Sequence, residues 1–309
     1  MGKVDILISE VGPRDGLQSI TNIMPTAAKK QWISALAAAG IREIEVGSFV
    51  PASVLPQLAD TAEIVAHGLT IEGLQIAVLV PNLRGAENAI ASGAHKISIP
   101  LSVSETHSLR NVKRTHAQML EEIARIAELV NSQPAHKRPH FEVGLSTAFG
   151  CSLEGPVSES LVVQLAEASL KAGCHEVGLS DTTGSANPAQ LRRLIDKVWS
   201  AVGRDKLTGV HLHNTRGQGL ANALAAIDMG ITTVDASMGG IGGCPAAPGA
   251  SGNIVTEDLV FMVEAMGLKT GVNFNALCAA RELFAAAMPN TELYGFTPMS
   301  GLPKGMEIN

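Results

Sequence analysis

The feature that most constrains the fold is an eightfold alternation of short apolar runs with longer Ala- and Leu-rich segments of helical period. The short runs are typical of buried parallel strands, and the longer segments are typical of amphipathic helices. The expected strands are 5–9, 42–46, 74–80, 95–99, 141–145, 176–179, 207–213 and 232–237. The expected helices are 26–39, 55–66, 84–92, 114–131, 157–172, 188–202, 218–229 and 256–266.

Strands that alternate with helices pair in parallel through right-handed crossovers, and eight such units over about 260 residues predict a (β/α)8 TIM barrel. We expect the barrel to extend over about 4–268, followed by an additional C-terminal helix within an extension over about 273–309. A doubly wound open sheet is the alternative, but no Gly-x-Gly-x-x-Gly turn follows the first strand. Because no linker divides the chain, we expect a single catalytic domain over 1–309.

Composition narrows the class of protein. The 309 residues are 46% hydrophobic with a formal net charge of −6, which argues against nucleic acid or an anionic membrane as the main partner. No apolar run reaches the roughly 18–20 residues that span a bilayer, and the start shows no signal-peptide pattern. The four cysteines form no C-x-x-C pair, so neither a zinc module nor a disulfide framework is indicated. We therefore expect a reduced, cytoplasmic protein.

Polar residues gather where the expected strands end. They are Glu10, Arg14 and Asp15 after the first strand, Glu45 and Ser48 at the end of the second, Asp181 after the sixth, His211 and His213 at the end of the seventh, and Cys244 and Asn253 after the eighth. The active sites of (β/α)8 barrels lie at the carboxyl ends of the strands. The sequence therefore predicts that these side chains share one rim of the barrel.

His211 and His213 are two residues apart on a strand, so their imidazoles point to the same side. Asp15 adds a carboxylate from the first strand, which neighbours the eighth once a barrel closes, and Asn253 adds an amide oxygen. Two nitrogen and two oxygen donors with open positions suit octahedral Mg²⁺ or Mn²⁺ better than tetrahedral zinc. The alternative is a core histidine that is satisfied by a backbone carbonyl.

Three charged residues on the predicted rim each have two interpretations. Arg14 is either a loop arginine paired with a carboxylate or a planar donor aimed at an oxyanion. Glu45 is either the partner of Arg14 or a neighbouring lysine, or part of a proton relay. Asp181 either caps a turn or orients a ligand histidine.

The segment 241–253 is rich in glycine and proline, which predicts a loop, and it carries Cys244. Long loops of this kind in compact domains are usually functional, so we expect the Cys244 thiol to meet substrate. Other residues are expected to be structural or to lie at the surface: Cys174, Cys278, His95, His107, His116, His136 and His140. The basic group Arg110, Lys113 and Arg114 either forms a solvated face or contacts the phosphates of a nucleotide-bearing substrate.

A resemblance to a known family rests on three segments, which are EVGPRDGLQ at 10–18, IEVGSFV at 44–50 and GGCPAAPGASGN at 242–253. The chain resembles the 3-hydroxy-3-methylglutaryl-CoA lyase family, the metal-dependent lyase branch of the Claisen-type (β/α)8-barrel enzymes. The resemblance covers nearly the whole chain. It departs from the family pattern at Ser19–Thr21, Asn214, Arg216 and Ser152, near the rim where an acyl group and CoA would bind.

The resemblance implies roles for individual residues. Asp15, His211, His213 and Asn253 would hold Mg²⁺ or Mn²⁺, Arg14 would stabilise a thioester enolate with support from Glu45, and Cys244 would be the catalytic thiol. His211 and Asp181 are also expected to serve catalysis, and Gln18, Ser48 and Arg216 to contact substrate.

The activity that the resemblance implies is cleavage of 3-hydroxy-3-methylglutaryl-CoA to acetoacetate and acetyl-CoA, as used in leucine degradation and ketone-body formation. The expected partner is a 3-hydroxyacyl-CoA, and the expected assembly is a homodimer. A methylmalyl- or citramalyl-type CoA ester remains open as the substrate. A Claisen-condensing synthase and a non-catalytic binding protein are further alternatives.

Overall fold

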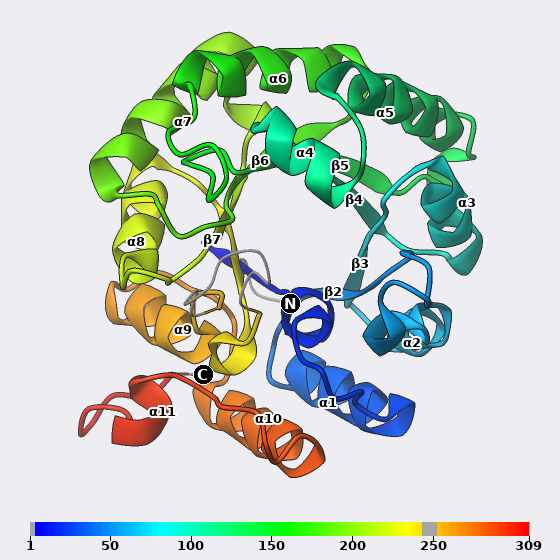
Figure 1. Cartoon of the computed structure of the whole chain (residues 1–309). Coiled ribbons are helices and arrows are strands. Elements are labelled where there is room, and N and C mark those ends of the chain that lie inside the picture. Colours follow the sequence, from blue (N-terminus) through cyan, green and yellow to red (C-terminus); the bar gives the residue numbers. More distant parts are fainter. Residues whose placement is uncertain (1–3, 243–251, 309) are drawn as a thin grey trace.

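The structure, a computed structural model, describes residues 4–242 and 252–308 and contains a closed barrel of eight parallel strands (Figure 1). The strands are β1 (Leu7–Glu10), β2 (Glu43–Ser48), β3 (Gln75–Leu79), β4 (Lys96–Ser102), β5 (His140–Ser146), β6 (Glu176–Asp181), β7 (Gly209–Leu212) and β8 (Thr233–Ala236). The ring closes where β8 pairs with β1, from Leu7 opposite Thr233 to Glu10 opposite Ala236. The predicted TIM barrel is confirmed.

Helices alternate with the strands and form the outer layer (Figure 1). The eight that complete the β–α units are α1 (Thr26–Ala38), α2 (Thr61–Gly68), α3 (Leu83–Ser92), α5 (His116–Asn131), α6 (Glu159–Lys171), α7 (Pro188–Val202), α8 (Gly219–Met229) and α9 (Thr256–Ala265). The remaining described helices are α4 (Glu105–Asn111), α10 (Phe274–Ala287) and α11 (Thr297–Ser300). Short turns complete the described elements: η1 (Gly12–Gly16), η2 (Pro56–Leu58), η3 (Ala135–Lys137), η4 (Arg204–Lys206) and η5 (Met238–Gly240).

The connection after β4 differs from the expectation of one helix over 114–131. Helix α5 begins at His116 because Thr115 accepts from the amide of Gln118, whose side chain bonds back to Thr115. A separate helix, α4, forms before it, and the Ser104 hydroxyl caps its first turn by accepting from the amide of His107. The connection therefore adds a helix at the carboxyl end of the barrel.

The connection after β1 also differs, because the π-helical turn η1 was not expected there. The amides of Arg14, Asp15 and Gly16 all bond to the carbonyl of Val11, so the chain doubles back directly at the strand end. This turn places Arg14 and Asp15 over the barrel opening.

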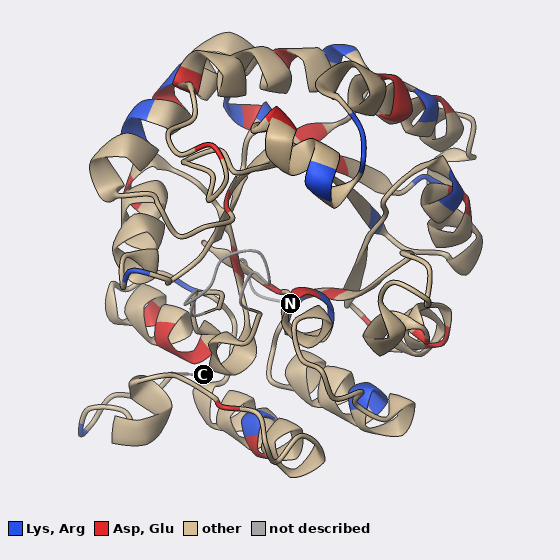
Figure 2. Ribbon diagram, in the orientation of Figure 1, with Lys and Arg blue, Asp and Glu red and all other residues tan. Residues whose placement is uncertain are grey.

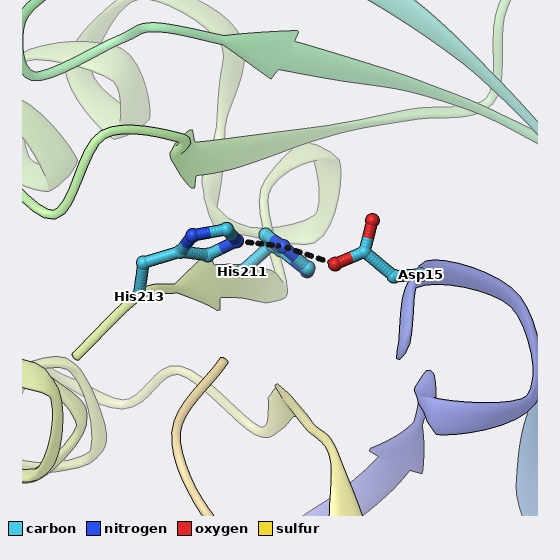
Figure 3. Close-up of side chains that lie close together, drawn as sticks. All are labelled: Asp15, His211 and His213. Atoms are coloured by element: carbon cyan, nitrogen blue, oxygen red, sulfur yellow. Dashed lines mark hydrogen bonds and ion pairs between the residues drawn. The ribbon is translucent and has the colours of Figure 1, made fainter. Parts of the chain in front are cut away.

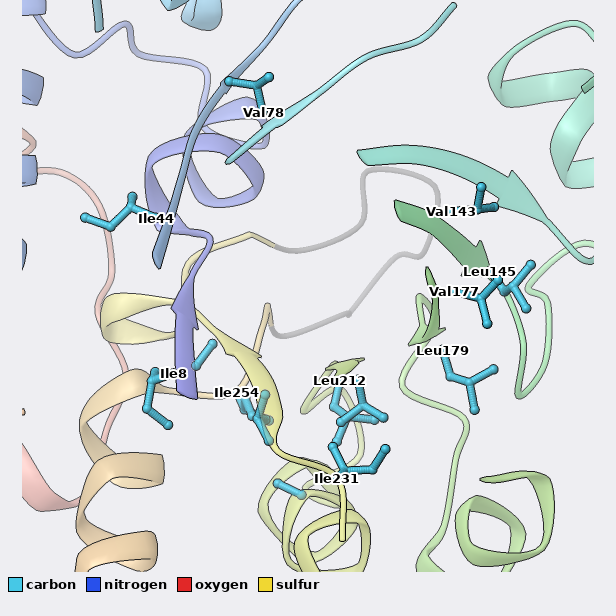
Figure 4. Packing of buried hydrophobic residues seen from close by; sticks show 14 of the residues in the cluster. Ile8, Ile44, Val78, Val143, Leu145, Val177, Leu179, Leu212, Ile231 and Ile254 are labelled. Carbon is cyan, nitrogen blue, oxygen red and sulfur yellow. The ribbon is translucent and has the colours of Figure 1, made fainter. Parts of the chain in front are cut away.

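The hydrophobic core lies between the strands and the helices (Figure 4). Ile8, Ile44, Val143 and Leu179 are at most 2% exposed and contribute to this layer. The alternate strand positions line an interior cavity of about 920 Å³. Many of its wall residues are charged or small, whereas bulky aliphatic residues commonly fill such barrels (Figure 2).

The C-terminal extension packs in the outer helical layer beside α1 and α9 (Figure 1). The rings of Trp32 in α1 and Phe284 in α10 have centroids 4.7 Å apart, and the amide of Asn273 bonds to the carbonyl of Ala39. The predicted additional helix is therefore present and covers the side of the barrel. Among the described residues, no helix combines the length and apolarity needed to cross a membrane.

Candidate active site

Asp15, His211 and His213 converge at the carboxyl end of the barrel (Figure 3). Their potential ligand atoms lie within 4.8 Å of one another. The Nε2 atoms of His211 and His213 are 3.0 Å apart, and His211 Nε2 lies 3.9 Å from Asp15 Oδ2. These side chains come from β7, the residue that follows it, and η1. The sequence expectation that they share one rim is confirmed.

Asn253 joins this cluster although it is more than two hundred residues from Asp15 in sequence. It pairs with His213 in an isolated antiparallel bridge, and its Nδ2 donates to Asp15 Oδ2 at 2.7 Å and to the carbonyl of Ile241 at 3.1 Å. Its Oδ1 is buried and has no hydrogen-bond partner among the described residues. A buried amide oxygen without a donor is an unusual feature that a bound cation would satisfy.

The donor set fits a divalent cation. Two ligands at about 2.1 Å from an ion and at right angles to each other lie about 3 Å apart, which matches the two imidazole nitrogens. Burial lowers the pKa of His213 to about 4, with a further contribution from His211. Burial opposes ionisation of Asp15, but Arg14 and the two histidines hold the pKa of its carboxyl below the usual value. A neutral imidazole and an ionised carboxylate are the forms that bind metal.

Arg14 lies between two carboxylates beside this cluster. Its Nε donates to Glu45 Oε2 at 2.5 Å, and its Nη1 donates to Asp15 Oδ1 at 2.7 Å. Glu45 also accepts from the hydroxyl of Ser98, and Gln18 donates to Asp15 Oδ1 at 2.8 Å. Arg14, Glu45 and Gln18 all line the cavity. Both interpretations of Arg14 therefore describe part of its position: it is paired with carboxylates, and it faces the cavity.

Asp235, which the sequence reasoning missed, occupies the position behind His211. Its Oδ2 lies 3.0 Å from His211 Nδ1, whereas the carboxylate of Asp181 accepts the amides of Ser185 and Ala186 in the loop after β6. Asp181 therefore caps a turn, which is the first of its two interpretations, and the carboxylate bonded to His211 is that of Asp235. Asp235 lies opposite His211 in the β7–β8 register. The sequence feature that could have revealed it is an acidic residue inside the expected eighth strand, at a position whose side chain faces the same side as His211.

Glu10, the first residue of the predicted rim, points away from the cavity. Its carboxylate accepts the amides of Gly12 and Met238 and the hydroxyl of Thr256. Complete burial raises the pKa of this carboxyl to about 7. Glu10 therefore joins β1, η5 and α9, and it positions the start of η1 without facing the cavity.

Comparisons with known proteins agree with this geometry. The model of the HMGL-like family matches residues 5–284. This chain belongs to the HMGL-like family. It is 39% identical over 296 residues to the hydroxymethylglutaryl-CoA lyase YngG of Bacillus subtilis, covering 94% of this chain and 97% of that protein.

Two further relatives extend the comparison. The mitochondrial hydroxymethylglutaryl-CoA lyase of Arabidopsis thaliana is 39% identical over 280 residues, which are 91% of this chain and 59% of that longer protein. The solved structure of an HMG-CoA lyase from Acinetobacter baumannii, in complex with coenzyme A and 3-methylmalate, superposes with a TM-score of 0.91 at 38% identity and covers 99% of both chains. Like these relatives, the chain is an enzyme of the carbon–carbon lyase class.

The family membership gives the Asp15–His211–His213 cluster a clear meaning. Enzymes of the HMGL-like family depend on a metal, and this cluster is the possible metal site in the part of the chain that the structure describes.

Two residues that we expected to contact substrate do not line the cavity. Ser48 is 1% exposed, and its hydroxyl accepts from the amide of Val50. Arg216 donates to the carbonyls of Thr183 and Gly184, both at 2.9 Å. Of the three expected substrate contacts, only Gln18 lies on the described cavity wall.

Cys244 lies outside the described residues, although Gly242, just before the undescribed segment, lines the cavity. The cysteines expected to be structural behave accordingly: burial raises the pKa of Cys174 to about 12 and raises that of Cys278 above its usual value. Three of the histidines expected to be structural or at the surface line the cavity: His95 and His140 where β4 and β5 begin, and His107 in α4.

Proposed function

We propose that this enzyme cleaves 3-hydroxy-3-methylglutaryl-CoA to acetoacetate and acetyl-CoA with the help of Mg²⁺ or Mn²⁺. The observation that carries the proposal is the convergence of two imidazole nitrogens and a carboxylate beside Arg14, in a chain of the HMGL-like family. Asp15, His211, His213 and Asn253 would hold the ion. When bound there, the ion supplies a Lewis acid that polarises the substrate oxygens and lowers the pKa of the 3-hydroxyl group.

The chain's own residues support the charge that develops during cleavage. The C2–C3 bond breaks as the hydroxyl loses its proton, which leaves a ketone and a thioester enolate. Arg14 uses Nε and Nη1 for Glu45 and Asp15, so its Nη2 is the nitrogen left to donate to the enolate oxygen. Glu45 and Asp15 fix the guanidinium, so little reorganisation is needed when the charge forms.

The enolate carbon then takes up one proton. The hydroxyl proton, held meanwhile by a base of the site, returns to the group that donated to carbon, so the reaction as a whole neither gains nor loses a proton. We propose the Cys244 thiol as the donor to C2. Its support is the glycine- and proline-rich sequence around it and the position of Gly242 on the cavity wall. His211 is held by Asp235 at Nδ1, which fixes its ring with Nε2 toward Asp15 and His213.

A related acyl group is the second candidate substrate. The Acinetobacter structure, a complex with coenzyme A and 3-methylmalate, shows a relative together with a branched hydroxydiacid. This favours a methylmalyl-type CoA ester over a condensing synthase as the alternative.

The test is a product assay on purified enzyme with Mg²⁺ or Mn²⁺, which offers 3-hydroxy-3-methylglutaryl-CoA beside methylmalyl- and citramalyl-type CoA esters. Formation of acetoacetate and acetyl-CoA from the first ester, abolished by EDTA and restored by the metal, is expected. Cleavage of only another ester would identify that ester as the substrate. Full activity in EDTA would contradict the proposed metal site.

We infer further that 1–309 acts as one domain, because a single hydrophobic cluster includes residues from Ile6 to Ile308. We also infer a homodimer in the cytoplasm. Phe296 and Met299, at 81% and 83% exposure, offer apolar surface for association, and the described cysteines are all free. Light scattering at several protein concentrations tests the dimer.

A further inference from the structure

The charged residues of the cavity wall indicate where the acyl group of the substrate lies. This inference rests on the proposed acyl-CoA substrate. Along the described wall, six carboxylates face four Lys and Arg side chains. The carboxylates are Asp15, Glu43, Glu45, Glu142, Glu176 and Asp235. A diacid acyl group brings a further carboxylate, which needs a cation or a hydrogen-bond donor that is not already in use.

Three of the four cations are in use. Arg14 is bound to Glu45 and Asp15. Lys96, on the interior wall, bonds Glu142 at 2.7 Å and Glu43 at 3.3 Å.

Arg114, at the opening, lies 3.2 Å from Glu122. Lys113 makes no ion pair with any residue that the structure describes. The barrel interior therefore offers an acyl carboxylate no unpaired cation, and the opening offers one.

Lys113 also has an unusual backbone. Its φ of 56° places it in the left-handed region, which non-glycine residues seldom occupy and which is concentrated at functional sites. It follows α4, which lies over the barrel opening on the side of β4 and β5, across the opening from the segment that follows β1 (Figure 1). Lys113 lines the cavity that Arg14 and Asp15 also line.

His107 also lines the cavity, from within α4 and six residues before Lys113, and it is 8% exposed. Its Nδ1 lies 2.8 Å from the hydroxyl of Ser102, while Nε2 has no partner among the described residues. A serine hydroxyl that donates to Nδ1 leaves the ring proton on Nε2. Burial, together with Arg110, lowers the pKa of His107, so the ring is neutral and acts as a hydrogen-bond donor.

We propose that His107 Nε2 and Lys113 Nζ form a subsite that binds the free carboxylate of the acyl group. The subsite lies across the opening from Arg14, so a substrate held at the Asp15–His211–His213 cluster spans the opening. The same chemistry would suit a phosphate of CoA, but His107 is buried in the cavity wall, and the phosphates lie beyond the pantetheine arm. The acyl carboxylate is therefore the expected ligand.

Two uncleavable ligands that differ only in this carboxylate provide the test. Glutaryl-CoA and pentanoyl-CoA both lack the 3-hydroxyl, so their dissociation constants can be measured by calorimetry on the intact enzyme in the presence of Mg²⁺. The variants are His107→Phe, His107→Gln, Lys113→Asn and, as a matched control, Arg110→Gln. Arg110 is a cation of the same helix that does not line the cavity, and Asn tolerates the left-handed backbone at position 113.

The wild-type enzyme should prefer glutaryl-CoA by at least about tenfold, the usual gain from one charge-assisted hydrogen bond. His107→Phe and Lys113→Asn should each lower this preference several-fold without weakening pentanoyl-CoA, and His107→Gln should retain part of it. Arg110→Gln removes a cation that lowers the pKa of His107, so it should not lower the preference. Equal weakening of both ligands and of free CoA would assign the subsite to a phosphate and overturn the proposal. An unchanged preference would also overturn it.

Thermal unfolding of each variant shows whether it folds. If the variants at one of the two positions fail to fold, the ligand preference of the variants at the other position tests the proposal. The outcome is separate from that of the proposed function, because an enzyme that does not cleave 3-hydroxy-3-methylglutaryl-CoA still reports its preference between the two uncleavable ligands.

Discussion

At the scale of single residues, the carboxylate behind His211 sets how well the cluster binds a cation. Asp235 fixes the ring through Nδ1, and such outer partners of a ligating histidine are worth roughly 10- to 100-fold in metal affinity. We expect Asp235→Asn to weaken Mn²⁺ binding by that factor, measured by calorimetry. Asp181→Asn is the matched control, because the hydrogen bonds of the Asp181 carboxylate to described residues all come from backbone amides of its own loop. A loss in Asp181→Asn as large as in Asp235→Asn would contradict this assignment.

Arg14 is expected to act on the reaction more than on substrate binding. Removal of one preorganised donor to a developing oxyanion costs about 10²–10³ in kcat. We expect Arg14→Gln to lose kcat by this factor, with a KM within a few-fold of the wild-type value, in steady-state assays. Because Arg14 also neutralises Asp15, Mn²⁺ affinity should be measured in parallel. A variant whose KM rises while kcat stays unchanged would contradict the proposal that Arg14 stabilises the enolate.

Some residues of the site could be predicted from the sequence, and others could not. Asp15, His211, His213 and Asn253 were predictable because polar residues after successive strands of a barrel must meet at one rim. The role of Asp235 was not predictable, because its contact with His211 depends on the register between β7 and β8, and the sequence alone does not show that register. His107 was missed because it faces the cavity from α4, a helix that periodicity did not separate from α5.

At the scale of elements, Glu10 ties β1 to η5 and α9 through three hydrogen bonds. Its pKa of about 7 lies above that of the unfolded chain, so the folded protein keeps a proton that the unfolded chain releases between about pH 4.5 and 7. The free energy of unfolding therefore falls as pH rises through this window, by about 3 kcal/mol from this group.

We expect Glu10→Gln to remove that pH dependence. A glutamine oxygen accepts from the amides of Gly12 and Met238, and its NH₂ group donates to Thr256, so the hydrogen bonds of the protonated carboxyl are kept. Urea unfolding between pH 5 and 8 should show the variant gaining stability relative to wild type as pH rises. A constant difference across this range would contradict the assignment of the raised pKa to Glu10.

The connections between elements mark the limit of prediction at this scale. The strands and outer helices follow from periodicity, but the π-helical turn η1 depends on one carbonyl, that of Val11, which accepts from three successive amides. No residue pattern predicts such a turn. The division of α4 from α5 was present in the sequence as two capping serine or threonine residues, Ser104 and Thr115.

At the scale of the whole molecule, the barrel interior contains carboxylates that are neutralised by cations. Removal of one of these cations should lower the free energy of unfolding. Lys96 is the cation between Glu43 and Glu142, and the pKa of Lys96 lies well above its usual value: burial opposes protonation, but the two carboxylates prevail. Lys96→Met leaves these carboxylates without their partner. Removal of one member of a buried ion pair costs about 3–5 kcal/mol, and we expect a loss of this order in urea unfolding at pH 7.

The second substitution separates charge from packing. Glu142→Gln in the Lys96→Met background removes one of the unpaired charges, so the double variant should recover part of the lost stability. If Lys96 contributed only by filling space, the second substitution would give no recovery, because Gln and Glu have nearly the same volume. Recovery that grows as pH rises would tie the effect to ionised carboxylates. A barrel interior built on ion pairs thus predicts coupling between Lys96 and Glu142 that an aliphatic interior would lack.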